Sequence, residues 1–193
     1  MKKLLLAVLI ALTATSVFAK GLQDERYVQG AIALTDFDGT SDLGTTLGLG
    51  GRLPMTENLD LLGGYSYFTA DFDGDDSTSH TLSVGGDWNF LPKQALNPFV
   101  GASFSYATFG GDNDADNTTG WALRGGVEFD LDNNWSVAPE LSYNLDEDFE
   151  NGAFAYGVSA NKWLTETLAV GAGVSTDEDA DNFTYAVAVN MAL

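Results

Sequence analysis

The chain has 193 residues, which is enough for one domain, and no cysteine, so a disulfide framework and thiol chemistry are both excluded. Its 28 Asp and Glu residues outnumber its eight Lys and Arg residues, and the formal net charge is −20. Nucleic-acid binding requires a basic surface, so this charge argues against a nucleic-acid partner.

Residues 1–19 have the pattern of a secretory signal peptide. Lys2 and Lys3 give a positive start, residues 4–12 form an apolar run, and Val-Phe-Ala at 17–19 suits a signal peptidase. The apolar run is too short for a membrane-spanning helix. We therefore expect cleavage after Ala19, which leaves residues 20–193 as one secreted domain.

The rest of the chain alternates apolar and polar residues with a period of two, which is typical of β-strands. The clearest case is 119–131, where Trp121, Leu123 and Phe129 share one face while Arg124 and Glu128 share the other. We expect ten strands, at about 27–35, 44–53, 59–70, 80–90, 98–109, 119–130, 135–145, 152–162, 168–176 and 183–192.

The connections between these strands alternate in character. Four are short and built from turn residues, at 54–57, 91–97, 131–134 and 164–167. The other five hold no Lys or Arg and most of the acidic residues: Asp36, Asp38, Asp42, Asp71, Asp73, Asp75, Asp76, Asp112, Asp114, Asp116, Asp146, Glu147, Asp148, Glu150, Asp177, Glu178, Asp179 and Asp181. With an even strand number, the acidic connections and the two termini fall at opposite ends.

Aromatic residues on the apolar parity gather near both ends of the strands. Trp88, Phe90, Phe129 and Trp135 lie near the short turns, and Tyr65, Tyr67, Tyr106, Trp121, Tyr143, Phe154, Tyr156, Phe183 and Tyr185 lie near the acidic connections. Amphipathic rings collect at lipid–water boundaries, and a soluble β-sandwich has no reason to place them so. The pattern predicts an all-β fold, a closed antiparallel up-and-down transmembrane β-barrel.

Two of the predicted strands also resemble a known family in their amino-acid sequence. Residues 97–106 (NPFVGASFSY) are similar to the Pro-aromatic-Val-Gly strand, and residues 138–143 (APELSY) to the Glu-Leu-x-Tyr strand, of small bacterial outer-membrane barrels, the OmpA-like and opacity-type superfamily often labelled porin family. That family is mostly eight-stranded, so eight strands is the alternative to ten. The resemblance implies a Gram-negative outer membrane with periplasmic termini, membrane lipid as a partner, and barrel-assembly machinery during insertion.

The strand residues expected to face inward are mostly Gly, Ala, Ser and Thr, and the few large residues expected among them are charged. We expect Arg52, Asp87, Arg124, Glu128 and Glu140 to form a lumen charge cluster, with Asp60 and Asp130 on the same parity. Rings of charge set selectivity in channels, but buried charges also pair simply to close a lumen. Two functions follow: a small porin-like channel for ions or very small solutes, biased toward cations, or a non-conducting structural or surface-interaction barrel.

Catalysis and cofactors have little support in the sequence. The single histidine, His80, and Ser83 have opposite parity, so we expect no serine–histidine pair and no enzyme activity. The run from Asp71 to Asp76 lacks the Gly and Glu positions of an EF-hand. We expect no bound cofactor beyond weak Ca²⁺ or Mg²⁺ binding at the acidic connections. The oligomeric state and any permeant solute or receptor are left open.

Overall fold

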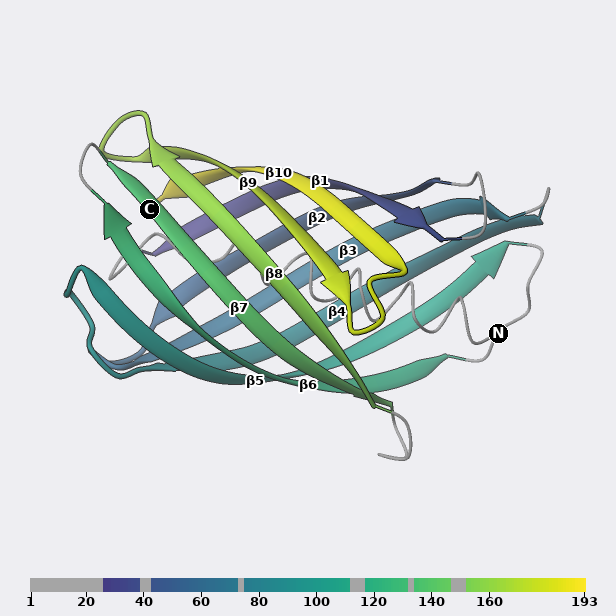
Figure 1. The fold of residues 1–193 in the computed structure, drawn as a ribbon, viewed down its shortest axis with the longest axis horizontal. Coiled ribbons are helices and arrows are strands. Elements are labelled where there is room, and N and C mark those ends of the chain that lie inside the picture. Colours follow the sequence, from purple (N-terminus) through teal and green to yellow (C-terminus); the bar gives the residue numbers. More distant parts are fainter. Residues whose placement is uncertain (1–25, 39–42, 73–74, 112–116, 132–133, 147–151) are drawn as a thin grey trace.

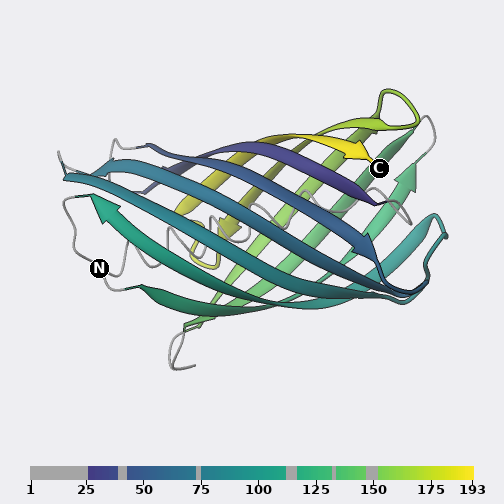
Figure 2. The ribbon, with the colours of Figure 1, turned by 180° about the vertical axis from the view of Figure 1, so that it is seen from behind.

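The computed structural model describes residues 26–38, 43–72, 75–111, 117–131, 134–146 and 152–193. They form ten strands: β1 (Tyr27–Phe37), β2 (Leu43–Pro54), β3 (Leu59–Phe72), β4 (Asp75–Asn89), β5 (Leu96–Gly111), β6 (Thr118–Leu131), β7 (Trp135–Asp146), β8 (Gly152–Trp163), β9 (Leu168–Asp177) and β10 (Asn182–Ala192). Each strand pairs antiparallel with its neighbours in the chain, and the sheet closes on itself (Figures 1 and 2).

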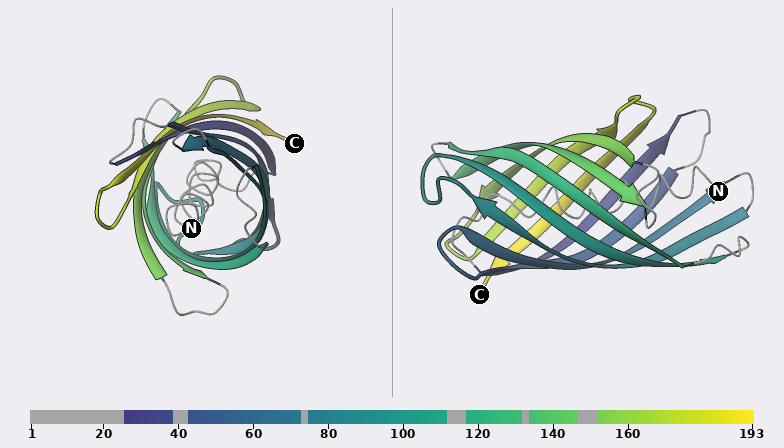
Figure 3. Two further views of the ribbon diagram at one scale, coloured as in Figure 1. Left: turned by 90° about the vertical axis from the view of Figure 1, so that its right-hand side faces the viewer. Right: turned by 90° about the horizontal axis from the view of Figure 1, so that it is seen from below.

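Closure comes from pairing between the first and last strands. β1 pairs with β2 on one side and with β10 on the other, so that Thr35 lies opposite Thr184. Their side-chain oxygens are 2.9 Å apart and share a hydrogen bond. The view along the barrel shows the resulting ring of strands (Figure 3). The expected fold class is confirmed, with ten strands rather than eight.

The strand positions expected from alternation are confirmed, and several strands are longer. The largest difference is β4, which begins at Asp75 rather than near His80. Ser77 pairs with Ala70 on β3 and with Gly111 on β5, so two neighbours hold this stretch in the sheet. Its Asp and Ser residues are typical of loops, but strand preference depends strongly on the pairing available.

The two ends of the barrel differ, and we name them by their connections. The acidic end is where β1–β2, β3–β4, β5–β6, β7–β8 and β9–β10 are joined, and the turn end holds the other four connections and Leu193. Turns at the turn end are tight: Met55 N–H donates to Leu59 O at 2.8 Å, and Leu164 N–H donates to Leu168 O at 2.9 Å. Lys93 and Asn134 take positive φ there, of 63° and 64°.

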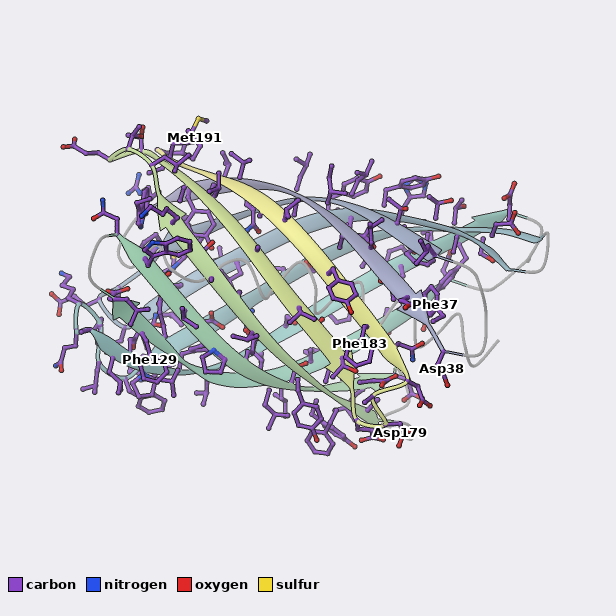
Figure 4. All side chains as sticks on the ribbon, turned by 45° about the horizontal axis from the view of Figure 1, so that its top comes forward. Phe37, Asp38, Phe129, Asp179, Phe183 and Met191 are labelled. Carbon is purple, nitrogen blue, oxygen red and sulfur yellow. The ribbon has the colours of Figure 1, made fainter. Side chains whose placement is uncertain are left out.

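The sheet carries apolar side chains on its outer face and polar side chains on its inner face, the reverse of a soluble domain. Large apolar side chains such as Leu123 and Val187 point outward and are exposed, whereas Arg52, Asp87 and Glu128 point inward and are buried. Figure 4 shows Phe129 and Met191 near the turn end, and Asp38 and Asp179 at the acidic end. The expected parity of the strands is confirmed. Among the described residues, no helix is long and apolar enough to cross a membrane.

Candidate functional site

Among the described residues, most of the buried charged side chains of the inward face lie toward the turn end. Arg124 is the centre of this cluster. Its Nε and Nη2 donate to Asp87 Oδ1 and Oδ2 at 2.9 and 2.6 Å, and its Nη1 lies 3.8 Å from Glu140 Oε1. Three strands supply these groups: β4 carries Asp87, β6 carries Arg124 and β7 carries Glu140. A forked, two-point contact of this kind fixes orientation as well as charge.

A glycine makes the Asp87–Arg124 pair possible. Asp87 lies opposite Gly101 on β5, and Gly101 lies opposite Arg124, so the pair must reach across an entire strand. A Cβ at position 101 would collide with Asp87 Oδ1 and would lie 2.8 Å from Gly86 O and 3.2 Å from Arg124 Nε. The absence of a side chain at Gly101 therefore leaves the space that the ion pair occupies.

Phe99 supports the arginine from the next inward position on β5. The Arg124 guanidinium carbon lies 5.9 Å from the centre of the Phe99 ring, a cation–π distance. The ring in turn covers Gly126, where a Cβ would lie 2.8 Å from Phe99 Cζ. Phe99 is 2% exposed although it faces the lumen. The ring therefore fills space beside the ion pair and excludes water from one side of it.

A second group begins with an ion pair between Arg52 and Asp60. Asn89 Nδ2 donates to Asp60 Oδ2 at 2.5 Å, and Asn97 Nδ2 donates to Asn89 Oδ1 at 3.1 Å. Asn89 is also held through its backbone, since its carbonyl accepts from Asn58 Nδ2 at 2.7 Å. The result is a continuous polar chain from β2 across β3, β4 and β5.

Glu128 and Tyr27 complete the cluster. Glu128 is fully buried on β6, four residues after Arg124 and on the same inward face. It interacts electrostatically with Arg52 and with Tyr27, which is 1% exposed. The cluster thus contains four carboxylates, Asp60, Asp87, Glu128 and Glu140, and two guanidinium groups. Its formal charge is negative.

The expected lumen residues are therefore brought together, with additions. All five of the expected members face inward and are buried: Arg52, Asp87, Arg124, Glu128 and Glu140. Asp60 joins them as the partner of Arg52, whereas Asp130 is exposed at the turn end. Tyr27, Asn89 and Asn97 were not anticipated as members of the cluster. Their inward parity was the signal that could have identified them.

Most of the remaining lumen lining is small and uncharged. Gly173, Ala186 and Ala33 lie in consecutive pairing positions on β9, β10 and β1. A cavity of about 60 Å³ lies against the wall formed by β1–β5. Gly, Ala and Ser make up most of its lining, together with Leu49, Leu62 and Val84, and both Gln29 and Arg124 border it. Small side chains leave room inside a barrel, whose diameter grows with strand number.

The acidic end has a different organisation. Asp177 is buried, and its Oδ1 accepts from the backbone N–H groups of Asp181 and Asn182 at 2.9 and 3.4 Å. Asp38 N–H donates to Asp181 O at 2.9 Å. Partial desolvation, followed by the nearby carboxylates of Asp38, Asp177 and Asp179, raises the pKa of the Asp181 carboxyl.

The acidic connections were expected to be loops throughout, and this is wrong for part of them. Six of their acidic residues lie within strands, because the hairpins extend further than composition suggests: Asp36, Asp71, Asp75, Asp76, Asp146 and Asp177. Four lie in turns or irregular segments, namely Asp38, Glu178, Asp179 and Asp181. The other eight fall outside the described residues: Asp42, Asp73, Asp112, Asp114, Asp116, Glu147, Asp148 and Glu150.

The described residues offer no metal site, and they do not pair His80 with Ser83. No group of three or more His, Asp or Glu side chains in those ranges is placed to hold a metal ion. His80 faces outward and Ser83 faces inward on the same strand. Ser83 Oγ donates to Gly64 O at 3.5 Å, so it points away from the imidazole.

Comparisons with known proteins agree with this architecture. A family model described as "Outer membrane protein beta-barrel domain" matches residues 4–161. An outer membrane channel from Pseudomonas putida F1 has a similar fold, with a TM-score of 0.56, 11% identity, and coverage of 88% of this chain and 96% of that one.

Two autotransporter domains are similar in fold. The translocator domain of NalP from Neisseria meningitidis gives a TM-score of 0.53 at 10% identity, covering 93% of this chain and 92% of that one. The beta domain of the Bordetella autotransporter BrkA gives 0.50 at 12% identity, covering 89% and 100%. No curated protein matches the chain. The family match spans most of the sequence, and the chain belongs to the outer membrane protein beta-barrel domain family.

Proposed function

We propose that this barrel is a small porin-like channel that passes ions or very small solutes and favours cations. The observation that carries the proposal is the lumen itself, where a negative cluster of four carboxylates and two guanidinium groups lies in a lining whose other residues are mostly small, apart from buried rings such as Phe68 and Phe99. Charged side chains around a narrow polar passage select ions by sign.

The acidic end supports the same selectivity. Its five connecting segments carry 18 acidic residues and neither Lys nor Arg. A concentration of charges of one sign raises the local concentration of counter-ions. Because the Debye length falls from about 10 Å at 0.1 M salt to about 3 Å at 1 M, this attraction weakens as salt rises.

We propose that the acidic end faces the exterior and that the turn end and both termini face the periplasm. Barrels of this membrane have short turns on the periplasmic side. The tight turns after β2 and β8 fit the periplasmic side. The outward apolar face would contact membrane lipid, and insertion would use the barrel-assembly machinery.

The test is a reversal-potential measurement on refolded protein in a planar bilayer across a salt gradient. The wild type is compared with a variant in which Asp71, Asp73, Asp75 and Asp76 are replaced by Asn. We expect cation selectivity at low salt, weaker selectivity at high salt, and a reduced preference in the variant. A matched control replaces Glu57 and Glu166, two exposed acids at the turn end, by Gln.

The second candidate is a non-conducting barrel, and the polar chain at the turn end favours it. Arg52, Asp60, Asn89 and Asn97 link β2 to β5 across the inward face. In this alternative the acidic end of the barrel would bind membrane lipid, a partner or, weakly, divalent cations. Absence of current from protein shown to be folded would contradict the channel and leave this alternative, whereas anion selectivity would contradict the proposed preference for cations.

A further inference from the structure

The outward face of β4 changes character at one residue. From the turn end it presents Trp88, Val84 and Leu82, all large, apolar and exposed. It then presents His80, Thr78 and Asp76. The same change occurs on β5 between Tyr106 and Thr108, which lies opposite His80. His80 therefore lies at the boundary between the apolar band and the polar acidic end.

Two tyrosines from β3 hold the imidazole in place. Tyr65 Oη lies 2.7 Å from His80 Nδ1, a hydrogen bond that is itself exposed. The Tyr65 ring stacks on the imidazole with 6.1 Å between centres and 28° between planes. Tyr67, directly opposite His80 in the ladder, packs with 5.0 Å between centres. With Nδ1 engaged by Tyr65, Nε2 is the nitrogen available to a molecule outside the barrel.

The charges around His80 make it distinctive. The acidic-end segments contain no Lys or Arg, and His80 is the only histidine in the chain. On β3 and β4, Asp71 and Asp76 lie beyond it toward the acidic end, opposite each other in the ladder. The facing positions on β5, Tyr106 and Thr108, bring no cation. Histidine is the side chain that gains positive charge between pH 5 and 8.

We propose that His80, oriented by Tyr65 and Tyr67, binds a phosphate group of the glycolipid in the outer leaflet of the membrane. The imidazolium supplies a charge-assisted Nε2–H donor to the phosphate oxygen. In that state Nδ1–H donates to Tyr65 Oη, and the Tyr67 ring stabilises the cation through its π face.

Depth and charge both select this occupant. The ring contacts place His80 in the aromatic belt, where side chains meet lipid headgroups. Because the acidic-end segments contain no Lys or Arg, His80 is the group at this depth of β4 that can carry positive charge toward a phosphate, and Asp71 and Asp76 lie beyond it. The site rests on the proposed orientation, with the acidic end outside, but it does not depend on whether the lumen conducts.

The experiment uses native mass spectrometry of the refolded, detergent-solubilised protein with diphosphoryl lipid A as the probe, at about pH 6 and about pH 8, the range over which histidine loses its charge. We expect the lipid-bound fraction of the wild type to fall as the pH rises. His80→Gln should bind weakly at both pH values, and His80→Arg should bind at both. Tyr65→Phe should weaken binding at about pH 6.

Tyr185→Phe is the matched control, because Tyr185 lies in the same outward belt on β10, far from His80, and should change nothing. Lipid phosphates also titrate in this range, so the comparison with His80→Gln carries the result. Equal pH dependence in wild type and His80→Gln overturns the proposal. So does full displacement of the lipid by inorganic phosphate, which would indicate a site for the free ion.

Discussion

At the turn end, buried carboxylates lie within reach of guanidinium groups, whereas at the acidic end carboxylates lie beside other carboxylates. Asp87 faces Arg124 across Gly101, while Asp71 faces Asp76 directly. The difference shows two uses of one chemical group. The stability of a pair of opposite charges depends on its geometry, so one added methyl group can disrupt it. The effect of a group of like charges depends on how many there are, and salt weakens it.

The largest effect should follow from removing the central cation of the turn end. Arg124→Ala leaves Asp87 and Glu140 buried without this partner, and breaking a buried pair costs about 3–5 kcal/mol. Urea unfolding of the barrel from lipid vesicles measures this loss. Arg26→Ala, an exposed residue at the start of the described chain, is the control and should cost under about 0.5 kcal/mol. A loss below about 1 kcal/mol for Arg124→Ala would mean that water already hydrates these carboxylates.

A charge on the neighbouring outward position should cost somewhat less. Leu123 is 55% exposed on the apolar face of β6, and Leu123→Arg should destabilise the barrel by about 2–4 kcal/mol if it lies near the bilayer midplane. Thr119→Arg, on the same face closer to the acidic end, should cost about 0–1 kcal/mol. The same unfolding assay measures both. Equal costs at the two positions would place the apolar band elsewhere.

Gly101→Ala tests whether the paired end depends on geometry alone. The added methyl meets Asp87 Oδ1 and Gly86 O, and overpacking of this kind costs about 1–3 kcal/mol. It should also abolish the energetic coupling between Asp87 and Arg124 in a double-mutant cycle. Gly63→Ala is the matched control, since its Cβ would meet only Ser83 O, at 3.9 Å. Unchanged coupling energy between Asp87 and Arg124 in the Gly101→Ala background would show that the ion pair does not require the glycine.

The smallest effect concerns pH at the acidic end. The raised pKa of Asp181 means that the folded state takes up its proton more readily than the unfolded state, so the group stabilises the fold in acid and this contribution is lost as pH rises through the folded pKa. Asp181→Asn should therefore raise the melting temperature at neutral pH and change little in acid. Melting curves of both proteins against pH measure this, and a pH-independent difference would contradict it.

The alternation of apolar and polar residues predicted the strands, their number and the faces on which Leu123 and Arg124 lie, because the side-chain period of a strand is a local property. It did not predict the Asp87–Arg124 pair. These residues lie on β4 and β6, and their meeting depends on the register of two hairpins and on the missing side chain at Gly101. Each register depends on turn geometry as well as on pattern.

Residues that look like turn or loop residues were the other difficulty. Asn89 and Asn97 flank a turn in the sequence, yet their amides are buried and join the lumen cluster. Ser77 looks like part of an acidic loop, yet two neighbouring strands pair with it. In both cases the tertiary partner decides the structure, and a local pattern carries no information about that partner.

The bond between Thr35 and Thr184 joins residues separated by 149 positions in the chain. Until β10 has been synthesised, β1 has an open edge, and an unpaired edge is a template for pairing with another molecule. Contacts of such high sequence separation form late and slowly. Loss of the last strand would therefore leave two open edges, on β1 and β9, and an assembly intermediate prone to aggregation.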